Sequence, residues 1–204
     1  MEAKRAIFLD KDGTLIPNIP YNANPDLIFL EKGVGETLAA LAEQFELIVI
    51  SNQAGIAMGY FTPEDLCAVE KRLQALLQEY GVRLSGFYYC PHHPEGTRAP
   101  YVKSCDCRKP APGLLFRAAK EHDISLRDSW MIGDILNDVQ AGNTAGCRSI
   151  IIDNGNETEW DLQDEPLRIP EFISADFAAA GKYILENQNL EQHAKSISSF
   201  PKEV

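Results

Sequence analysis

Continuous apolar runs along the chain predict buried strands, and they alternate with segments of helical periodicity. The short runs lie at residues 5–9, 46–52, 84–90, 129–134 and 148–152. Runs of this kind are typical of strands covered on both faces of a mainly parallel sheet. Strands that alternate with helices predict an α/β fold, a Rossmann-like three-layer α/β/α sandwich.

Helical spacing of apolar residues predicts the segments that connect these strands, at residues 33–45, 112–122, 138–146 and 175–187. The best-marked helix follows Thr62, with Pro63 at its first position and Asp65 placed for a capping box. We expect Gly81 to end it. Its predicted buried stripe comprises Leu66, Val69, Leu73, Leu76, Leu77 and Tyr80.

The length and charge of the chain restrict the class of protein. With 204 residues it fits a single domain, predicted at 1–187, and a polar C-terminal tail at 188–204. The net charge of −11, without a basic cluster, disfavours binding to nucleic acid. The sequence has no apolar run long enough for a membrane span, and its first residues do not resemble a secretory signal. We therefore expect a cytoplasmic monomer.

Polar residues follow three of the predicted strands. Asp10 and Asp12 follow the first, Ser51 ends the second, and Asp134 follows the fourth. Asp and Gly are common in turns, so a simple turn is the alternative reading of the DKDGT segment taken alone. In a doubly wound sheet, however, ligands bind beyond the carboxyl ends of the strands. Three strand ends that carry polar groups therefore favour a functional site at that edge.

A second cluster lies in the long loop after the third strand. Its spacing is C-x-H, twelve residues, then C-x-C, formed by Cys90, His92, Cys105 and Cys107. Three thiolates and one imidazole suit a closed tetrahedral zinc site, whose role is structural because no position stays open. The zinc-binding loop is therefore predicted at 90–107. The two remaining cysteines, Cys67 and Cys147, are expected to be core thiols.

Four motifs in this order, LDKDGTL, ISNQ, CRKP and GDILND, resemble the signatures of the haloacid dehalogenase (HAD) superfamily of phosphotransferases. The resemblance covers roughly residues 5 to 155 and implies a HAD-like fold. Asp10 would be the nucleophile that forms an aspartyl-phosphate, and Asp12 the general acid and then base. Ser51 and Lys109 would hold the phosphoryl oxygens as charge shifts in the transition state.

The same resemblance implies a catalytic Mg²⁺. Its predicted ligands are the side chains of Asp10 and Asp134 and the backbone carbonyl of Asp12, because Mg²⁺ prefers few protein oxygens in octahedral geometry. Asp138 is expected to support this set of ligands. An Asp that donates a proton at neutral pH needs a raised pKa, which we expect for Asp12 from burial and the neighbouring carboxylate.

The CPHHPEGT and CDCRKP segments resemble a zinc-loop subgroup that acts on heptose 1,7-bisphosphate or histidinol phosphate. The resemblance implies removal of the 7-phosphate of D-glycero-D-manno-heptose 1,7-bisphosphate, in the ADP- or GDP-heptose and lipopolysaccharide precursor pathway. Histidinol phosphate or another small sugar or amino-alcohol phosphate is the alternative substrate. A silent phosphate-binding or zinc scaffold would have no need for Asp12, and a nucleic-acid 3′-phosphatase is disfavoured by the acidic charge.

Between the motifs there is no room for a full cap domain, so we expect an open site walled by the zinc loop and residues 17–25. Ile135 stands where the heptose enzymes usually have a lysine. Arg108 could supply a forked contact to a second phosphate. By resemblance, the substrate contacts are Asn18, Ile19, Pro20, Tyr21, Ser51, Asn52, Gln53, Ala54, Arg108 and Lys109.

Overall fold

The computed structural model describes residues 3–160, 162 and 165–198, with side chains described through residue 188. It contains one six-stranded sheet in the order β3-β2-β1-β4-β5-β6, in which every neighbouring pair is parallel. The strands are β1 (Ala6–Leu9), β2 (Glu46–Asn52), β3 (Gly86–Cys90), β4 (Trp130–Gly133), β5 (Arg148–Ile152) and β6 (Phe172–Ser174). The three-layer α/β sandwich predicted from the sequence is confirmed.

Strand β1 lies at the centre of the sheet. Ile7 pairs with Leu47 of β2 on one side and with Trp130 of β4 on the other. The chain first adds β2 and β3 on one side of β1 and then crosses to add β4, β5 and β6 on the other. Such a reversal opens a crevice at the carboxyl ends of the two central strands, which is where ligands bind in this architecture.

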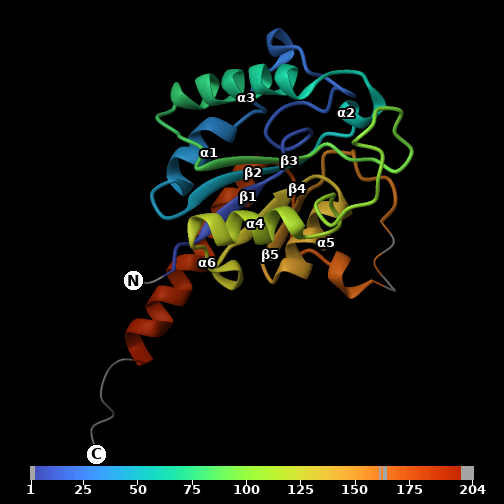
Figure 1. Ribbon diagram of the computed structural model, residues 1–204. Helices are drawn as coiled ribbons and strands as arrows, with labels where there is room; N and C mark the ends of the chain where they lie inside the picture. Colours follow the sequence, from blue (N-terminus) through green and yellow to red (C-terminus); the bar gives the residue numbers. More distant parts are fainter. Residues whose placement is uncertain (1–2, 161, 163–164, 199–204) are drawn as a thin grey trace, which may run out of the picture.

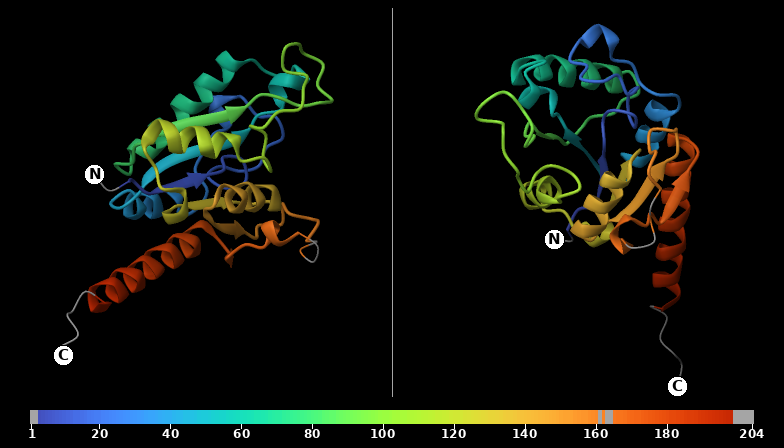
Figure 2. Two further views of the ribbon diagram at one scale, coloured as in Figure 1. Left: turned by 60° about the horizontal axis from the view of Figure 1, so that its bottom comes forward. Right: turned by 90° about the vertical axis from the view of Figure 1, so that its right-hand side faces the viewer.

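Helices cover both faces of the sheet (Figures 1 and 2). One face carries α1 (Val34–Leu41), α3 (Pro63–Gln78) and α6 (Phe177–Ser198), and the other carries α4 (Gly113–His122) and α5 (Leu136–Ala145). Successive residues of β1 alternate between the two layers: Ile7 and Leu9 join the first core, whereas Ala6 and Phe8 join the second. Because both faces are buried, the strand sequences are continuously apolar.

Helix α3 begins as its sequence predicts. Thr62 accepts a hydrogen bond from the backbone N–H of Asp65, and the Asp65 carboxylate accepts one from Thr62 N at 2.8 Å. The buried face consists of Leu66, Val69, Leu73 and Leu77. Tyr80 does not belong to it: the helix ends at Gln78, and the tyrosine is exposed.

One other expectation is wrong, and three elements go beyond what the sequence predicts. Cys67 is exposed rather than in the core, because it lies on the outer face of α3, whereas Cys147 is buried as expected. Strand β6 and the four-residue helix α2 (Gly55–Met58) are too short to give a periodic signal. Helix α6 continues past residue 188, where composition predicted the tail to begin, and runs through Ser198 (Figure 2). The rest of that tail, 199–204, lies outside the described residues.

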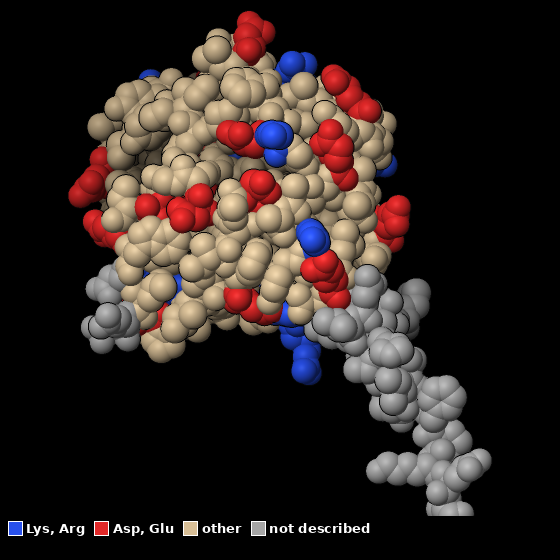
Figure 3. Space-filling model, turned by 180° about the vertical axis from the view of Figure 1, so that it is seen from behind, with Lys and Arg blue, Asp and Glu red and all other residues tan. Residues whose placement is uncertain are grey.

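The charge of the surface and the apolarity of the helices bear on the class of protein. Carboxylates outnumber basic side chains on the face seen in Figure 3, in line with the net charge of −11. None of the described helices combines the length and apolarity needed to cross a bilayer.

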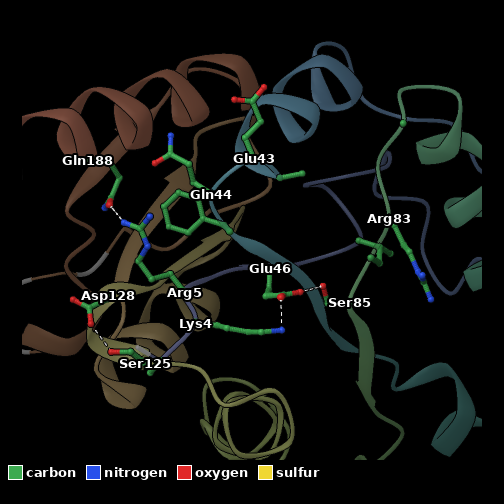
Figure 4. Close-up of a pocket in the computed structure, with 15 residues that line it drawn as sticks. Lys4, Arg5, Glu43, Gln44, Glu46, Arg83, Ser85, Ser125, Asp128 and Gln188 are labelled. Atoms are coloured by element: carbon green, nitrogen blue, oxygen red, sulfur yellow. Dashed lines mark hydrogen bonds and ion pairs between the residues drawn. The ribbon is translucent and has the colours of Figure 1, made fainter. Parts of the chain in front are cut away.

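A cavity of about 1160 Å³ lies at the amino ends of the strands, the edge opposite to the predicted site (Figure 4). Several of its polar and charged groups contact one another. Lys4 contacts Glu46 at 2.7 Å, and Glu46 also accepts a hydrogen bond from Ser85. The Arg5 side chain donates to Gln188 and lies 5.0 Å from the centroid of the Phe45 ring. These contacts fasten α6 and the strand starts to each other.

Candidate active site

Three carboxylates meet at the carboxyl ends of β1 and β4. Asp10 follows β1, Asp134 follows β4, and Asp138 projects from the first turn of α5; each is at most 7% exposed. One oxygen from each lies within 4.8 Å of the others. Burying three like charges together is unfavourable unless cations compensate. A cluster of hard oxygen donors of this kind fits a divalent cation such as Mg²⁺.

Lys109 supplies one compensating charge. Its buried ammonium contacts the Asp10 carboxylate, lies 2.6 Å from Asp138 Oδ1 and donates to Ile50 O at 2.8 Å. Burial alone would lower the pKa of Lys109, but the Asp10 and Asp138 carboxylates raise it above its ordinary value. The side chain therefore stays charged. Two hydrogen bonds of 3.0 Å between Asn52 and the Lys109 backbone fix its position.

Asp12 has the environment of a proton donor. Its carboxylate accepts hydrogen bonds from Lys11 Nζ at 2.5 Å and from Gln53 Nε2 at 3.0 Å. Burial raises the pKa of Asp12, and the Asp10 charge adds to this, although Lys11 acts against it. Gln53 also donates to Ser51 Oγ at 2.7 Å, so one amide links the ends of β1 and β2.

Residues after β5 complete the site, and sequence reasoning missed them. Asn156 Nδ2 donates to Asp134 Oδ2 at 2.7 Å, and Asn154 Nδ2 donates to the Gly13 carbonyl at 2.6 Å. A Cβ on Gly13, whose φ is +84°, would lie only 2.1 Å from Asp134 Oδ2. Asn residues in a turn-rich segment give no periodic signal, so only the fold shows this contact.

Lys11 is the other residue that the motif reading passed over. Its side chain is fully buried, and its ammonium group pairs with the Asp12 carboxylate. Lysine is rarely buried without such a partner. The position of a lysine between two motif aspartates was the available signal. A lysine held there places a positive charge beside the proton donor.

The second cluster consists of the three thiols and one imidazole predicted as metal ligands. The sulfur atoms of Cys90, Cys105 and Cys107 lie 3.2 to 3.5 Å apart, and His92 Nδ1 lies 3.3 Å from Cys107 Sγ and 3.7 Å from Cys90 Sγ. Four ligands at about 2.3 Å from one ion are separated by about 3.8 Å. The four predicted residues are thus brought together, and they could hold a metal ion.

This loop is joined to the active site at both ends. Cys90 O, at its start, accepts a hydrogen bond from Gln53 N at 2.8 Å, and Lys109 follows its last cysteine by two residues. Arg108, between Cys107 and Lys109, has a buried guanidinium nitrogen, Nη1, with no hydrogen-bond partner among the described residues. An orphaned buried donor is unfavourable until a ligand oxygen accepts from it.

The predicted substrate residues lie in three segments around the carboxylates. Asn18, Pro20 and Tyr21 are exposed and Ile19 is half-buried, all in the loop that follows the first motif. Asn52 is hydrogen-bonded to the Lys109 backbone, and Gln53 to Asp12 and Ser51. Ala54 directly precedes α2. The structure brings these segments to one edge of the sheet, and their substrate contacts stay predictions.

Replacing Asp134 tests the electrostatics of the carboxylate cluster. Burial raises the pKa of Asp134 to about 8, and the Asp10 and Asp138 charges contribute. A raised folded-state pKa means that protonation stabilises the fold below about pH 4 and that this stability is lost as pH rises through about 8. In magnesium-free buffer, thermal melts should show a melting temperature that falls from pH 5 to pH 8. Asp134→Asn should flatten this dependence and melt higher at pH 8.

Asp128→Asn, at the opposite edge of the sheet, is the control and should keep the wild-type pH dependence. Added Mg²⁺ should raise the melting temperature of the wild type at pH 8 and have little effect on Asp134→Asn. An Asp134→Asn protein that melts below the wild type at pH 8 would contradict this account of the cluster.

Comparison with known proteins agrees with this fold. Residues 106–180 match the HAD-hydrolase-like family model. A D-glycero-beta-D-manno-heptose-1,7-bisphosphate 7-phosphatase of Photorhabdus laumondii is 43% identical over 141 residues, 69% of this chain and 75% of the relative. The enzyme of the same name from Helicobacter pylori is 38% identical over 172 residues, 83% of this chain and 90% of the relative.

A solved structure gives the same result for the fold. The D,D-heptose 1,7-bisphosphate phosphatase from B. bronchiseptica, crystallised with magnesium and phosphate, has a TM-score of 0.77 at 28% identity. The match covers 90% of this chain and 99% of that one. Fold and site together define a phosphatase of the HAD-like class. The chain belongs, within that class, to the same family as the two bacterial relatives.

Proposed function

We propose that this enzyme removes the 7-phosphate from D-glycero-D-manno-heptose 1,7-bisphosphate in a Mg²⁺-dependent reaction. The relatives named above carry this activity in their names. The observation that carries the chemistry is the arrangement of Asp10 and Asp12, in which the first contacts Lys109 and the second lies in an environment that raises its pKa.

The metal site fits the proposal. The Asp10 and Asp134 side chains and the Asp12 backbone carbonyl would hold Mg²⁺, with Asp138 turned to Lys109. When bound, Mg²⁺ supplies positive charge that offsets the repulsion between the phosphate and the carboxylate that attacks it.

The first step transfers the phosphoryl group to the protein. An Asp10 oxygen forms a bond to phosphorus as the bond between phosphorus and the sugar oxygen breaks. The proton of Asp12 passes to the departing sugar oxygen. Lys109, which contacts Asp10, and the buried Ser51 would stabilise the charge that builds up on the phosphoryl oxygens in the transition state.

The second step releases phosphate. Asp12, now ionised, takes a proton from a water molecule, whose oxygen attacks the phosphorus of the aspartyl-phosphate. The bond between phosphorus and the Asp10 oxygen breaks, which restores the carboxylate, and Asp12 holds the proton for the next turnover. Gln53 keeps the Asp12 carboxylate in place during both steps.

The thiol and imidazole cluster would hold structural Zn²⁺, since its four donors leave no position for substrate. The site keeps Arg108 and Lys109 oriented toward the phosphate because both directly follow its last ligand. Cys107→Ser should therefore lower the zinc content, measured by metal analysis of the dialysed protein, and reduce kcat at least about tenfold. Cys67→Ser, at the exposed cysteine of α3, should change neither. A zinc-free Cys107→Ser protein with full activity would exclude this role.

The substrate assignment rests on the relatives and on Arg108, whose unpartnered Nη1 is suited to a second phosphate or to sugar oxygens. Histidinol phosphate is the second candidate, because Ile135 replaces the lysine usual in the heptose enzymes.

Phosphate release from a panel of esters tests the proposal. The panel comprises heptose 1,7-bisphosphate, heptose 7-phosphate, histidinol phosphate and other small sugar phosphates, each with and without Mg²⁺. We expect the highest kcat/KM for the bisphosphate and loss of activity without the metal. A higher value for histidinol phosphate would overturn the substrate, and no release from any ester would overturn the phosphatase mechanism.

A further inference from the structure

A short segment after β5, the β5 turn (residues 154–157), sends side chains into the active site, and the mechanism above uses none of them. Asn154 Nδ2 donates to the Gly13 carbonyl at 2.6 Å. Asn156 Nδ2 donates to Asp134 Oδ2 at 2.7 Å. The β5 turn therefore contacts both the first motif and a carboxylate at the end of β4.

Asp134 differs from the other two clustered carboxylates in the group that holds it. The Lys109 ammonium contacts Asp10 and Asp138. Among the described residues, the shortest hydrogen bond to the Asp134 carboxylate comes instead from the neutral amide of Asn156. An ammonium group at this position would neutralise the carboxylate and compete with a metal ion. An amide fixes the carboxylate and leaves it its negative charge.

The amide engages one of the two carboxylate oxygens. Asn156 Nδ2 donates to Asp134 Oδ2, whereas Oδ1 has a long contact of 3.5 Å with Thr14 Oγ1. A Cβ on Gly13 would lie 2.1 Å from Asp134 Oδ2 and 2.6 Å from Asn156 Nδ2, so the chain packs closely around this hydrogen bond. The carboxylate is thus oriented from the Oδ2 side, and Oδ1 stays available to a metal ion.

The β5 turn is itself fastened in place. Gly155 has φ +85°, in the left-handed region that favours glycine. Asn156 N donates to Asn154 Oδ1 at 3.1 Å, and Glu157 Oε2 accepts from the N–H of Leu136, the first residue of α5, at 2.7 Å. Ordering these side chains costs conformational entropy that the contacts offset. They hold the Asn156 amide toward the carboxylate.

We propose that Asn156 is a positioning residue for the metal ligand Asp134: its amide holds one carboxylate oxygen and leaves the charge and the other oxygen for Mg²⁺. Asn154 and Glu157 anchor the segment that carries it. The inference rests on the proposed function, because it concerns the Mg²⁺ of that reaction. Loss of a partner that orients a metal ligand typically weakens metal binding about 10- to 100-fold.

Calorimetric titration with Mg²⁺ in the absence of substrate tests the inference. The wild type is compared with Asn156→Leu, because leucine has a similar volume and no donor. We expect the Kd for Mg²⁺ to rise at least about tenfold, whereas Asn156→Gln, which keeps the amide, should stay within about threefold of the wild type. Asn156→Ala places no apolar group beside the carboxylate. It should also weaken binding, and it replaces the leucine variant if that protein does not fold.

Phosphate release at increasing Mg²⁺ concentration gives a second readout. The Mg²⁺ concentration for half-maximal rate should rise in Asn156→Leu by the same factor as the Kd. At saturating Mg²⁺, kcat should stay within about twofold of the wild type, because Asn156 acts through Asp134 and not on the reacting atoms. A residue with a merely structural role would instead lower kcat at every Mg²⁺ concentration.

Asn143→Leu is the matched control. The Asn143 amide, in the last turn of α5, donates to the carbonyls of Leu167 and Ile169 at 2.8 and 2.9 Å, so it also ties this helix to a loop. This variant should melt at a lower temperature and bind Mg²⁺ with wild-type affinity. An unchanged Kd in Asn156→Leu, or an equal loss in Asn143→Leu, would overturn the inference alone. A wild type that binds no Mg²⁺ would overturn the metal site of the proposed function and the inference with it.

Discussion

Asn in place of Asp10 is expected to lower kcat about a thousandfold or more while leaving the fold intact. The amide cannot form the aspartyl-phosphate, so both steps of the reaction are lost. The side-chain volume is unchanged, and Lys109 retains its contacts with Asp138 and the Ile50 carbonyl. Phosphate release at saturating Mg²⁺ measures the loss, and circular dichroism with thermal melting checks the fold.

Asp128→Asn, at the opposite edge of the sheet, is the matched control and should keep full activity. An Asp10→Asn protein that retained more than a few per cent of wild-type kcat would rule out covalent catalysis by this residue. Trapping of labelled phosphate on the wild type, and not on the variant, provides a second measurement.

Lys109→Met should be the most damaging of these substitutions for stability, and it should also lower activity. The lysine is 3% exposed and contacts two carboxylates, Asp10 and Asp138, which lose their partner when the charge is removed. Removing one member of a buried ion pair costs roughly 3–5 kcal/mol of the free energy of unfolding. We also expect kcat to fall at least about a hundredfold, because the phosphoryl oxygens lose a cation. Urea unfolding and phosphate release measure the two effects.

The double variant Lys109→Met with Asp138→Asn distinguishes the two effects. Removing the unpaired Asp138 charge should restore part of the stability, because fewer buried carboxylates then lack a partner. Activity should stay low. A Lys109→Met protein as stable as the wild type would show that the carboxylate cluster does not depend on this cation.

Much of the site could be predicted because its residues occupy local motifs. The signal for Asp10 and Asp12 is a turn directly after an apolar strand, and Cys90, His92, Cys105 and Cys107 have the composition of a metal site in one long loop. The capping box at Thr62 likewise depends only on neighbours in sequence. Interactions within a few residues leave a pattern that the chain shows before it folds.

The unpredicted parts depend on residues far apart in the chain. Asn156 reaches Asp134, Tyr21 lies against Tyr60, and neither pair shares a motif. Asp138 was expected to support the metal ligands, and only the fold shows that its carboxylate pairs with Lys109. The exposure of Cys67 also depends on which face of α3 the sheet covers, and that of Tyr80 on where the helix ends.

The sequence alone therefore determined the alternation of strands and helices through local periodicity and the gathering of thiol and imidazole donors through their spacing in one loop, and the phosphatase class followed from the resemblance of its motifs to a known family. Only the tertiary structure decided how the charges compensate one another and that Asn154 and Asn156 reach the first motif and Asp134. Burial and the distance between charges arise when distant strand ends come together, and no local stretch of sequence specifies them.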